Sequence, residues 1–188
     1  MKRKRFNKRV IFEFVSITFA VFLGLMLNTW KESNRNSELA DKSIENIKKE
    51  VVANKKNVSE MLVEHEERLA TVDSLLLELE ESVKVKNREV NIVFHFVNST
   101  SWETAKLTQA VAYMDLNFVT EVSGIYEAQD YYQGLVRIYA QQRMTTLSDD
   151  DEKKALEKMQ VFLYSIVWLE RNLIESYDDF LKLPNVIG

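Results

Sequence analysis

The hydrophobic pattern of the chain begins with one long apolar run over residues 10–27, in which Glu13 is the only charged residue. Polar residues and a tryptophan close the run at positions 28–30. An α-helix rises about 1.5 Å per residue, so about twenty residues cross a hydrocarbon core about 30 Å thick. Residues 10–30 are therefore predicted to form a transmembrane anchor.

A second pattern follows, in which apolar residues recur three or four positions apart with no helix breaker between Glu38 and Lys86. Such spacing predicts an amphipathic helix. Two positions of this apolar stripe are polar instead, Asn54 and His65. We expect residues 31–86 to form one long helix that continues from the anchor or is hinged to it. The apolar members of the stripe are Ile44, Ile47, Val51, Val58, Leu62, Leu69, Val72, Leu76, Leu79 and Val83.

The chain contains only 4 glycines and 1 proline, far fewer than the turns of a β-protein require. The predicted fold is all-α: an N-terminal transmembrane helix followed by an antiparallel helical bundle with one long first helix. Residues 87–188 supply the remaining bundle helices, at about 101–114, 116–144 and 149–182.

Two predicted helix starts carry capping signals. Thr100 and Glu103 have the spacing of a capping box, and Ser148 precedes a run of acids that suits the positive end of a helix dipole. The segment 87–100 is too apolar for an exposed loop. Its pattern leaves a short helix and an extended connection both open.

The charges around the anchor predict its orientation. Residues 1–9 form a basic tail with six Lys or Arg residues, which the positive-inside rule keeps cytoplasmic. Arg9 and Trp30 then lie at the two membrane interfaces, and Arg9 is placed to pair with Glu13 four residues later. A cleaved signal peptide is the alternative, but no small-x-small cleavage pattern follows the run, so a retained anchor is favoured.

One face of the anchor combines small and polar residues. At 100° per residue, the residues on this face are Glu13, Ile17, Ala20, Gly24 and Asn28. Ala20 and Gly24 form a small-xxx-small pair, which lets two helices approach closely. We interpret the face as a helix–helix contact, with a second copy or with a partner's span. Such pairs also occur by chance in membrane helices, and the sequence leaves both interpretations open.

Charge restricts the partners of the exported part. The first 30 residues carry six cations and one acid, so the remaining 158 carry a net charge of −9 within a total of −4. An acidic domain argues against nucleic acid as a partner. The expected partners are the lipid bilayer, the protein itself and other inner-membrane or periplasmic proteins. With no cysteine in the chain, non-covalent contacts alone must hold the domain together.

No motif for catalysis or cofactor binding is present in the sequence. His65 and His95 lack the spacing of a di-iron or zincin site, and we expect His65 to be a core-edge residue with a hydrogen-bond partner. We predict neither an enzyme nor a metal or cofactor site. An aromatic set fills a bundle core more often than it lines a ligand cleft, and both are open here: Trp102, Tyr113, Phe118, Tyr126, Tyr131, Tyr132, Tyr139 and Trp168.

Three stretches resemble a family of small bacterial single-pass proteins of unknown function, abundant in Bacteroidota. They are Glu13 with the apolar run and 27–32 (LNTWKE), then 101–106 (SWETAK) and 125–132 (IYEAQDYY). The residues at 106–109 (KLTQ) depart from the Ser-Gly that is frequent in the family, which puts the turn there in doubt. The resemblance implies a retained anchor in the bacterial inner membrane and a helical fold, and it supplies no activity.

Together these patterns favour a membrane-anchored helical interaction or scaffold module, homo-oligomeric or an accessory subunit of an envelope complex. Two alternatives remain. One is a ligand-sensing helical domain that signals through a partner's span. The other is a pore or transport subunit with Glu13 at its mouth, although the span is otherwise too apolar to line a wet channel.

Overall fold

A computed structural model of the chain describes residues 8–81, 90–145 and 152–183. Every regular element in this part of the chain is helical, which confirms the predicted all-α fold with one long first helix. The elements are α1 (Lys8–Glu80), α2 (Thr100–Leu107), the short 3-10 helix η1 (Ala110–Tyr113), α3 (Leu116–Thr145) and α4 (Glu152–Leu181).

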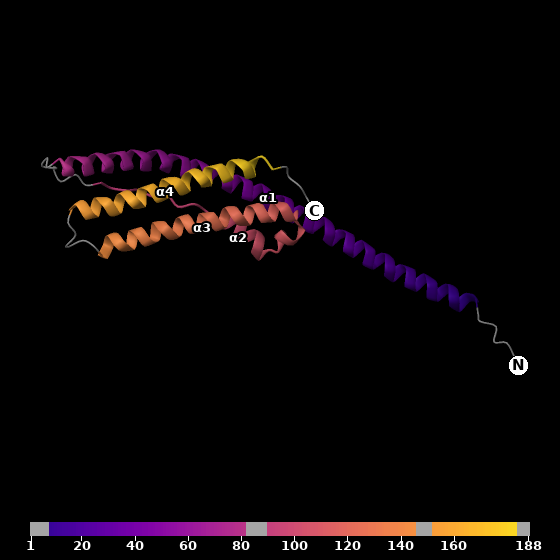
Figure 1. The fold of residues 1–188 in the computed structure, drawn as a ribbon. Coiled ribbons are helices and arrows are strands. Elements are labelled where there is room, and N and C mark those ends of the chain that lie inside the picture. The colour runs from indigo at the N-terminus through magenta and orange to yellow at the C-terminus, as the bar shows by residue number, and fades with distance from the viewer. Residues whose placement is uncertain (1–7, 82–89, 146–151, 184–188) are drawn as a thin grey trace.

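Helix α1 runs without a break from the apolar run into the bundle. The stretch 33–37 has low helix propensity but does not interrupt the helix. Of the two expected arrangements, a continuous helix or a hinged one, the structure therefore shows the continuous helix. Side chains at 11–35 are exposed, and burial becomes complete first at Ala40. The first part of α1, residues 8–35, therefore projects from the bundle without covering contacts, and we call it the bare rod (Figure 1). Among the described residues, α1 is the one helix long and apolar enough to cross a membrane.

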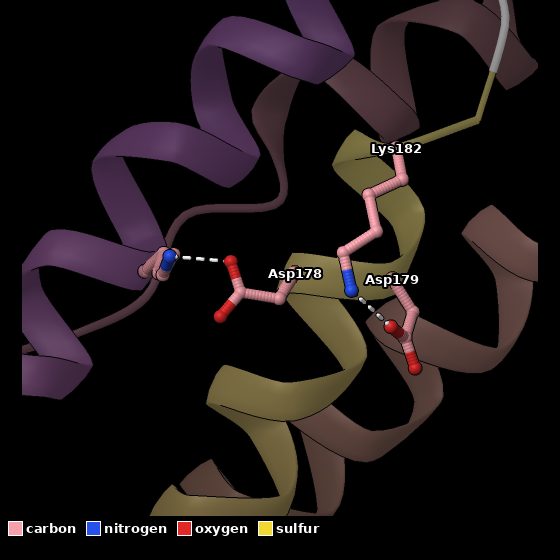
Figure 2. A network of polar contacts seen from close by, with 4 residues as sticks. Asp178, Asp179 and Lys182 are labelled. Atoms are coloured by element: carbon pink, nitrogen blue, oxygen red, sulfur yellow. Dashed lines mark hydrogen bonds and ion pairs between the residues drawn. The ribbon is translucent and has the colours of Figure 1, made fainter.

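Beyond the rod, α1 packs antiparallel to α4. Residue numbers rise along α1 while those of their partners fall along α4. The polar pairs that show this are Lys55–Asp178, Glu66–Arg171, Asp73–Gln160 and Glu80–Lys153. Figure 2 shows the pair of Asp178 with Lys55 beside the local pair of Asp179 with Lys182. These pairs are partly exposed and each contributes little stability, but together they report the register.

Helix α4 packs against both long helices, α1 and α3. The segment 90–99 runs extended between α1 and α3, bonded to α1 through Asn54 and to α3 through Gln133. Its side chains alternate: Val90, Ile92 and Phe94 lie in or against the core, and the residues between them are exposed. Of the two possibilities for 87–100, the structure shows the extended connection over 90–99.

The predicted helix at 101–114 is wrong as a single element. Helix α2 ends at Leu107, and Gln109 takes a left-handed conformation with φ of 60° before η1 begins. That turn lets Ala110 and Met114 reach the core, which a continuous helix would not allow both to do after Trp102 and Ala105. Tertiary burial has here outweighed local helix propensity.

The predicted capping box is also wrong. Ser99 occupies the N-cap position and Thr100 is the first helical residue, with no side-chain cap. The amide of Ser101 instead donates to the carboxylate of Glu50 on α1, at 2.9 Å. Two predictions fall outside the described residues. They are the cap at Ser148 with the acids at 149–151, and the continuation of the first helix over 82–86. Helices α3 and α4 otherwise closely follow the ranges 116–144 and 149–182.

Two glycines of α3 give a test of this fold. Gly124 and Gly134 lie inside a regular helix, and a Cβ added at either would meet no atom within 4 Å. We predict that Gly124→Ala and Gly134→Ala each raise the free energy of unfolding by about 0.5–1 kcal/mol, the difference in helix propensity.

Urea unfolding of the full chain in detergent, followed by circular dichroism, measures this change. Ala53→Gly, an exposed position inside α1, is the matched reverse control and should lower stability by a similar amount. A loss of stability in either glycine variant would mean that another part of the protein covers that face of α3.

Candidate functional site

The two polar positions in the apolar stripe of α1 are both fully buried, and both bind the extended segment. Asn54 donates to the carbonyl of Asn98 at 2.7 Å and accepts from the amide of Asn98 at 2.9 Å. One side chain thus replaces the two backbone bonds that a neighbouring strand would have made. This pair fixes the height of the segment along α1.

His65 makes a second such contact, eleven residues further along α1. Its Nε2 lies 2.9 Å from the carbonyl oxygen of Val93, and its Nδ1 lies 2.8 Å from a carboxylate oxygen of Glu170 on α4. The Tyr132 hydroxyl of α3 donates to that same oxygen at 3.1 Å. His65 and Glu170 are both 0% exposed, so α1, α3, α4 and the extended segment meet at one buried point.

Geometry determines how many protons this point holds. A carbonyl only accepts, so His65 Nε2 must carry a proton toward Val93. Two bare acceptors 2.8 Å apart would repel, so a proton must also lie between Nδ1 and Glu170. The pair is then either an imidazolium beside a carboxylate or a neutral imidazole beside a carboxylic acid. In both forms its net charge is zero, which is what burial requires.

Glu50 links neighbouring elements in a similar way, at a position on α1 closer to the bare rod. One of its oxygens accepts from the amide of Ser101, and the other accepts from the hydroxyl of Tyr126 at 2.6 Å. The Tyr126 ring stacks on Trp102 with centroids 5.8 Å apart, which joins α3 to α2. Gln133 of α3 completes the set by donating to the carbonyl of Val97 at 2.7 Å. We call these groups the polar seam: Glu50, Asn54, His65, Tyr126, Tyr132, Gln133 and Glu170.

Burial changes the acidity of the tyrosines along this seam. Burial raises the pKa of Tyr126 and Tyr132 well above the usual value, and the neighbouring carboxylates Glu50 and Glu170 add to the rise. Burial likewise raises the pKa of Tyr177. Gln129 lies close enough to oppose that last rise slightly, but among the described residues neither its amide nitrogen nor the Tyr177 hydroxyl makes a hydrogen bond of good geometry.

The polar seam suits a structural task better than a chemical one. Its carboxylates and imidazole already have partners in the bundle: His65 binds the carbonyl of Val93 and Glu170, and Glu50 binds the amide of Ser101 and the hydroxyl of Tyr126. Its innermost members are closed to solvent, so a substrate could not reach them without opening the bundle. The expected hydrogen bond of His65 is present, with two partners instead of one, but the residue lies fully inside the core and not at its edge.

The predicted contact face of the anchor lies on the bare rod. Glu13, Ile17, Ala20, Gly24 and Asn28 are all exposed, and a Cβ added at Gly24 would meet no atom within 4 Å. Because α1 is regular there, the five residues share one helix face. A partner helix at this face stays a prediction.

The two interfacial residues also lie on the rod. Arg9 Nε lies 3.8 Å from Glu13 Oε1, so the expected pair is present. Trp30, near the other end of the rod, is exposed. The contact of these residues with membrane interfaces stays a prediction.

A second surface feature, which we call the aromatic groove, opens on the outer face of α3 and α4. It is a shallow cleft of about 420 Å³. Three of its rings, Tyr131, Tyr164 and Trp168, are 54–64% exposed. The lining residues are Tyr131, Leu135, Tyr164, Ser165, Trp168 and Leu169.

The aromatic residues singled out in the sequence divide between the two roles considered for them. Trp102, Phe118, Tyr126 and Tyr132 are buried in the core. Tyr131 and Trp168 instead line the groove, and Tyr113 is exposed. The two groups differ in the helix face on which they lie, toward the core or away from it. Residue type alone does not show which face that is.

Sequence reasoning missed most of the polar seam, although one signal was present. Glu170 stands seven residues after Leu163 and seven before Tyr177, both of which are buried in the apolar stripe of α4. A charged residue in such a stripe carries the same information as Asn54 and His65 do in α1. Glu50 and Gln133 gave no such signal, because they lie at the edge of the core.

Comparisons with models of known protein families, with curated proteins and with solved structures found no match to this chain. The family resemblance carried by the anchor and the later aromatic stretches therefore stays a prediction.

The Asn54–Asn98 pair gives the sharpest test of the polar seam. Replacing Asn54 by Leu removes two part-buried hydrogen bonds to the peptide groups of Asn98, and each such bond contributes about 0.5–1.5 kcal/mol. We predict that Asn54→Leu lowers the free energy of unfolding by about 1–3 kcal/mol in urea titrations. The exposed Asn46→Leu on the same helix should change it by less than about 0.5 kcal/mol. Equal effects would show that Asn54 does not hold the segment.

The buried tyrosines predict a loss of stability in alkali. Their pKa values are raised on folding, so the stabilisation is complete below the unfolded value of about 10 and is lost as pH rises above it. Unfolding free energies measured between pH 8 and 11 should fall more steeply for the native chain than for Tyr177→Phe, which removes one of these groups. Lysines titrate in the same range in both proteins, so the difference isolates Tyr177. Parallel curves would contradict the assignment.

Proposed function

We propose that this chain is a membrane-anchored helical interaction module of the bacterial cell envelope. Residues 1–9 would lie in the cytoplasm, the apolar part of α1 would cross the inner membrane, and the bundle would stand in the periplasm. In this position the bundle would bind other copies of the chain or other envelope proteins, as a homo-oligomer or as an accessory subunit.

The observation that carries this proposal is the two-part character of α1. Its first part exposes an unbroken series of large apolar side chains and contacts nothing else in the described chain. At about 25 cal/mol per Å² of apolar surface, such a rod would be strongly unfavourable in water. Its later part forms one wall of a bundle with a core of its own, so the apolar rod is not needed for folding.

Two features support an interaction role over a chemical one. The acid–base groups of the polar seam are already engaged within the bundle: His65 binds the carbonyl of Val93 and pairs with Glu170, and Glu50 accepts from the amide of Ser101. The surface, by contrast, offers an open small-residue face on the anchor and an open aromatic groove on the bundle. Both are typical of places where another protein packs.

The anchor face supplies the contact between copies in this proposal. Small residues at Ala20 and Gly24 allow two helices to approach closely, and Asn28 offers a hydrogen bond across them. Without a hydrophobic driving force inside lipid, close van der Waals contact of this kind is what holds membrane helices together.

Single cysteines test this contact cleanly, because the chain has no cysteine of its own. We predict that Ala20→Cys and Gly24→Cys form disulfide-linked dimers in native membranes, several-fold more than Phe22→Cys, which points to the opposite side of the helix. Non-reducing gels after mild oxidation give the measurement.

Cross-linking that is equally strong at Phe22→Cys would show random collision. An absence of dimers in all three variants would remove the homo-oligomer and leave the accessory-subunit form of the proposal.

A further inference from the structure

The aromatic groove is an apolar surface that the fold itself leaves open. Tyr131, Tyr164 and Trp168 keep more than half of their surface in solvent, and no other described segment covers them. A contiguous apolar patch of this kind, rich in Tyr and Trp, is the composition of interaction hot spots.

The groove continues past its lining residues as two matched stripes. On α3 the stripe is Tyr131, Leu135 and Ile138; on α4 it is Val161, Tyr164 and Trp168. Both stripes repeat at three and four residues, so each lies along one helix face.

The register of the two helices places these stripes opposite each other. Tyr139 and Phe162 stack across the pair with ring centroids 3.9 Å apart, which sets Ile138 near Val161. Tyr131 and Trp168 meet at the other end, where both line the cleft. The groove is thus elongated along the helices, and its shape fits a helix that carries apolar residues at i, i+3 or i+4, and i+7.

The charged residues around the groove indicate which kind of partner helix it would bind. Glu127 and Asp130 of α3 and Glu175 of α4 are exposed around the Tyr131–Trp168 end. Within the described residues, no ion pair or hydrogen bond engages these three carboxylates, and Glu175 acts only at a distance to raise the pKa of Lys182. The whole exported part carries a net charge of −9 as well. A basic segment is therefore both attracted to the groove and neutralised there, and its cations can stack on the exposed rings.

The same charges disfavour a second copy of this chain at this place. Copies anchored in one membrane point the same way, so residues at equal height would meet, and acids would face acids. Like charges brought together at an interface oppose association.

We infer that the aromatic groove is the docking site for a basic amphipathic helix of another envelope protein. This inference rests on the proposed interaction role and names the surface and the chemistry of the partner. It separates into two contributions: the rings supply affinity, and the acidic rim supplies preference for a basic partner.

Three synthetic peptides of equal length test the inference on the full chain in nanodiscs of zwitterionic lipid, to which the peptides have little attraction of their own. The first carries a leucine stripe flanked by Lys and Arg; the second has the same stripe flanked by Glu; the third has the basic composition without the stripe. Isothermal titration should show the first binding at least about tenfold more tightly than either other, with an affinity that falls as salt rises.

Variants then assign the binding to the groove. Trp168→Ala combined with Tyr131→Ala should weaken the first peptide by at least about tenfold. Phe96→Ala, an exposed aromatic residue outside the groove, is the matched control and should leave binding unchanged. Glu127→Gln combined with Asp130→Asn should remove most of the preference for the basic peptide and most of its salt dependence. Unchanged circular dichroism of each variant establishes that the bundle is intact.

Three outcomes would overturn the inference. The first is equal binding of the three peptides, and the second is an effect of Trp168→Ala no larger than that of Phe96→Ala. The third is dissociation of a dimer of the purified chain by the groove variants, which would assign the groove to a second copy. Because peptide binding does not involve the anchor face, failure here is distinguishable from failure of the cysteine cross-links that test the proposed function.

Discussion

The segment 90–99 runs extended through the bundle, and none of the described residues forms a strand beside it, so its peptide groups need side chains as partners. Asn54 binds both peptide groups of Asn98, and His65 and Gln133 bind the carbonyls of Val93 and Val97. These requirements explain why polar residues interrupt the apolar stripes of the long helices. They also explain why Glu170 is buried beside His65, because Nε2 of the imidazole donates to Val93 and one proton between Nδ1 and Glu170 leaves the pair without net charge.

The need of the segment 90–99 for side-chain partners determines how the helices are arranged around it. Along 90–99 the segment lies between α1 and α3, and α4 is the long helix that packs against both of them. Because the segment crosses from one end of the bundle toward the other, α3 begins near the point where α1 leaves the bundle and runs parallel to α1 (Figure 1). The consequence for function is that α3 and α4 turn one shared face outward, and this face carries the aromatic groove.

Periodicity predicted much of this from the sequence, and tertiary contacts account for the rest. The apolar run, the stripe of α1 and the ranges of α3 and α4 follow from local spacing of side chains, which depends only on helix geometry. Two features depend on residues that are far apart in the chain. They are the break in the helix at Gln109 and the hydrogen bond from the Ser101 amide to Glu50. Local pattern cannot contain that information. The polar positions Asn54, His65 and Glu170 fall between these cases, since the sequence marks them as exceptions without saying what they bind.

The groove shows the same division. Two of its lining residues, Tyr131 and Trp168, belong to the aromatic set identified in the sequence, but the neighbouring residues Tyr131 and Tyr132 differ in burial, one exposed and one buried. Only the rotation of α3 against α4 decides between them, and that rotation is set by the core.

The proposed function depends most on where the bundle resides. Single cysteines at Val161 and Glu175, both exposed on α4, can be treated in spheroplasts with a maleimide that does not cross the inner membrane. We expect both to be labelled in intact spheroplasts, and we expect the protein to stay with the membrane fraction after alkaline washing. Labelling that appears only after lysis, or a protein released into the soluble fraction, would contradict the proposed function.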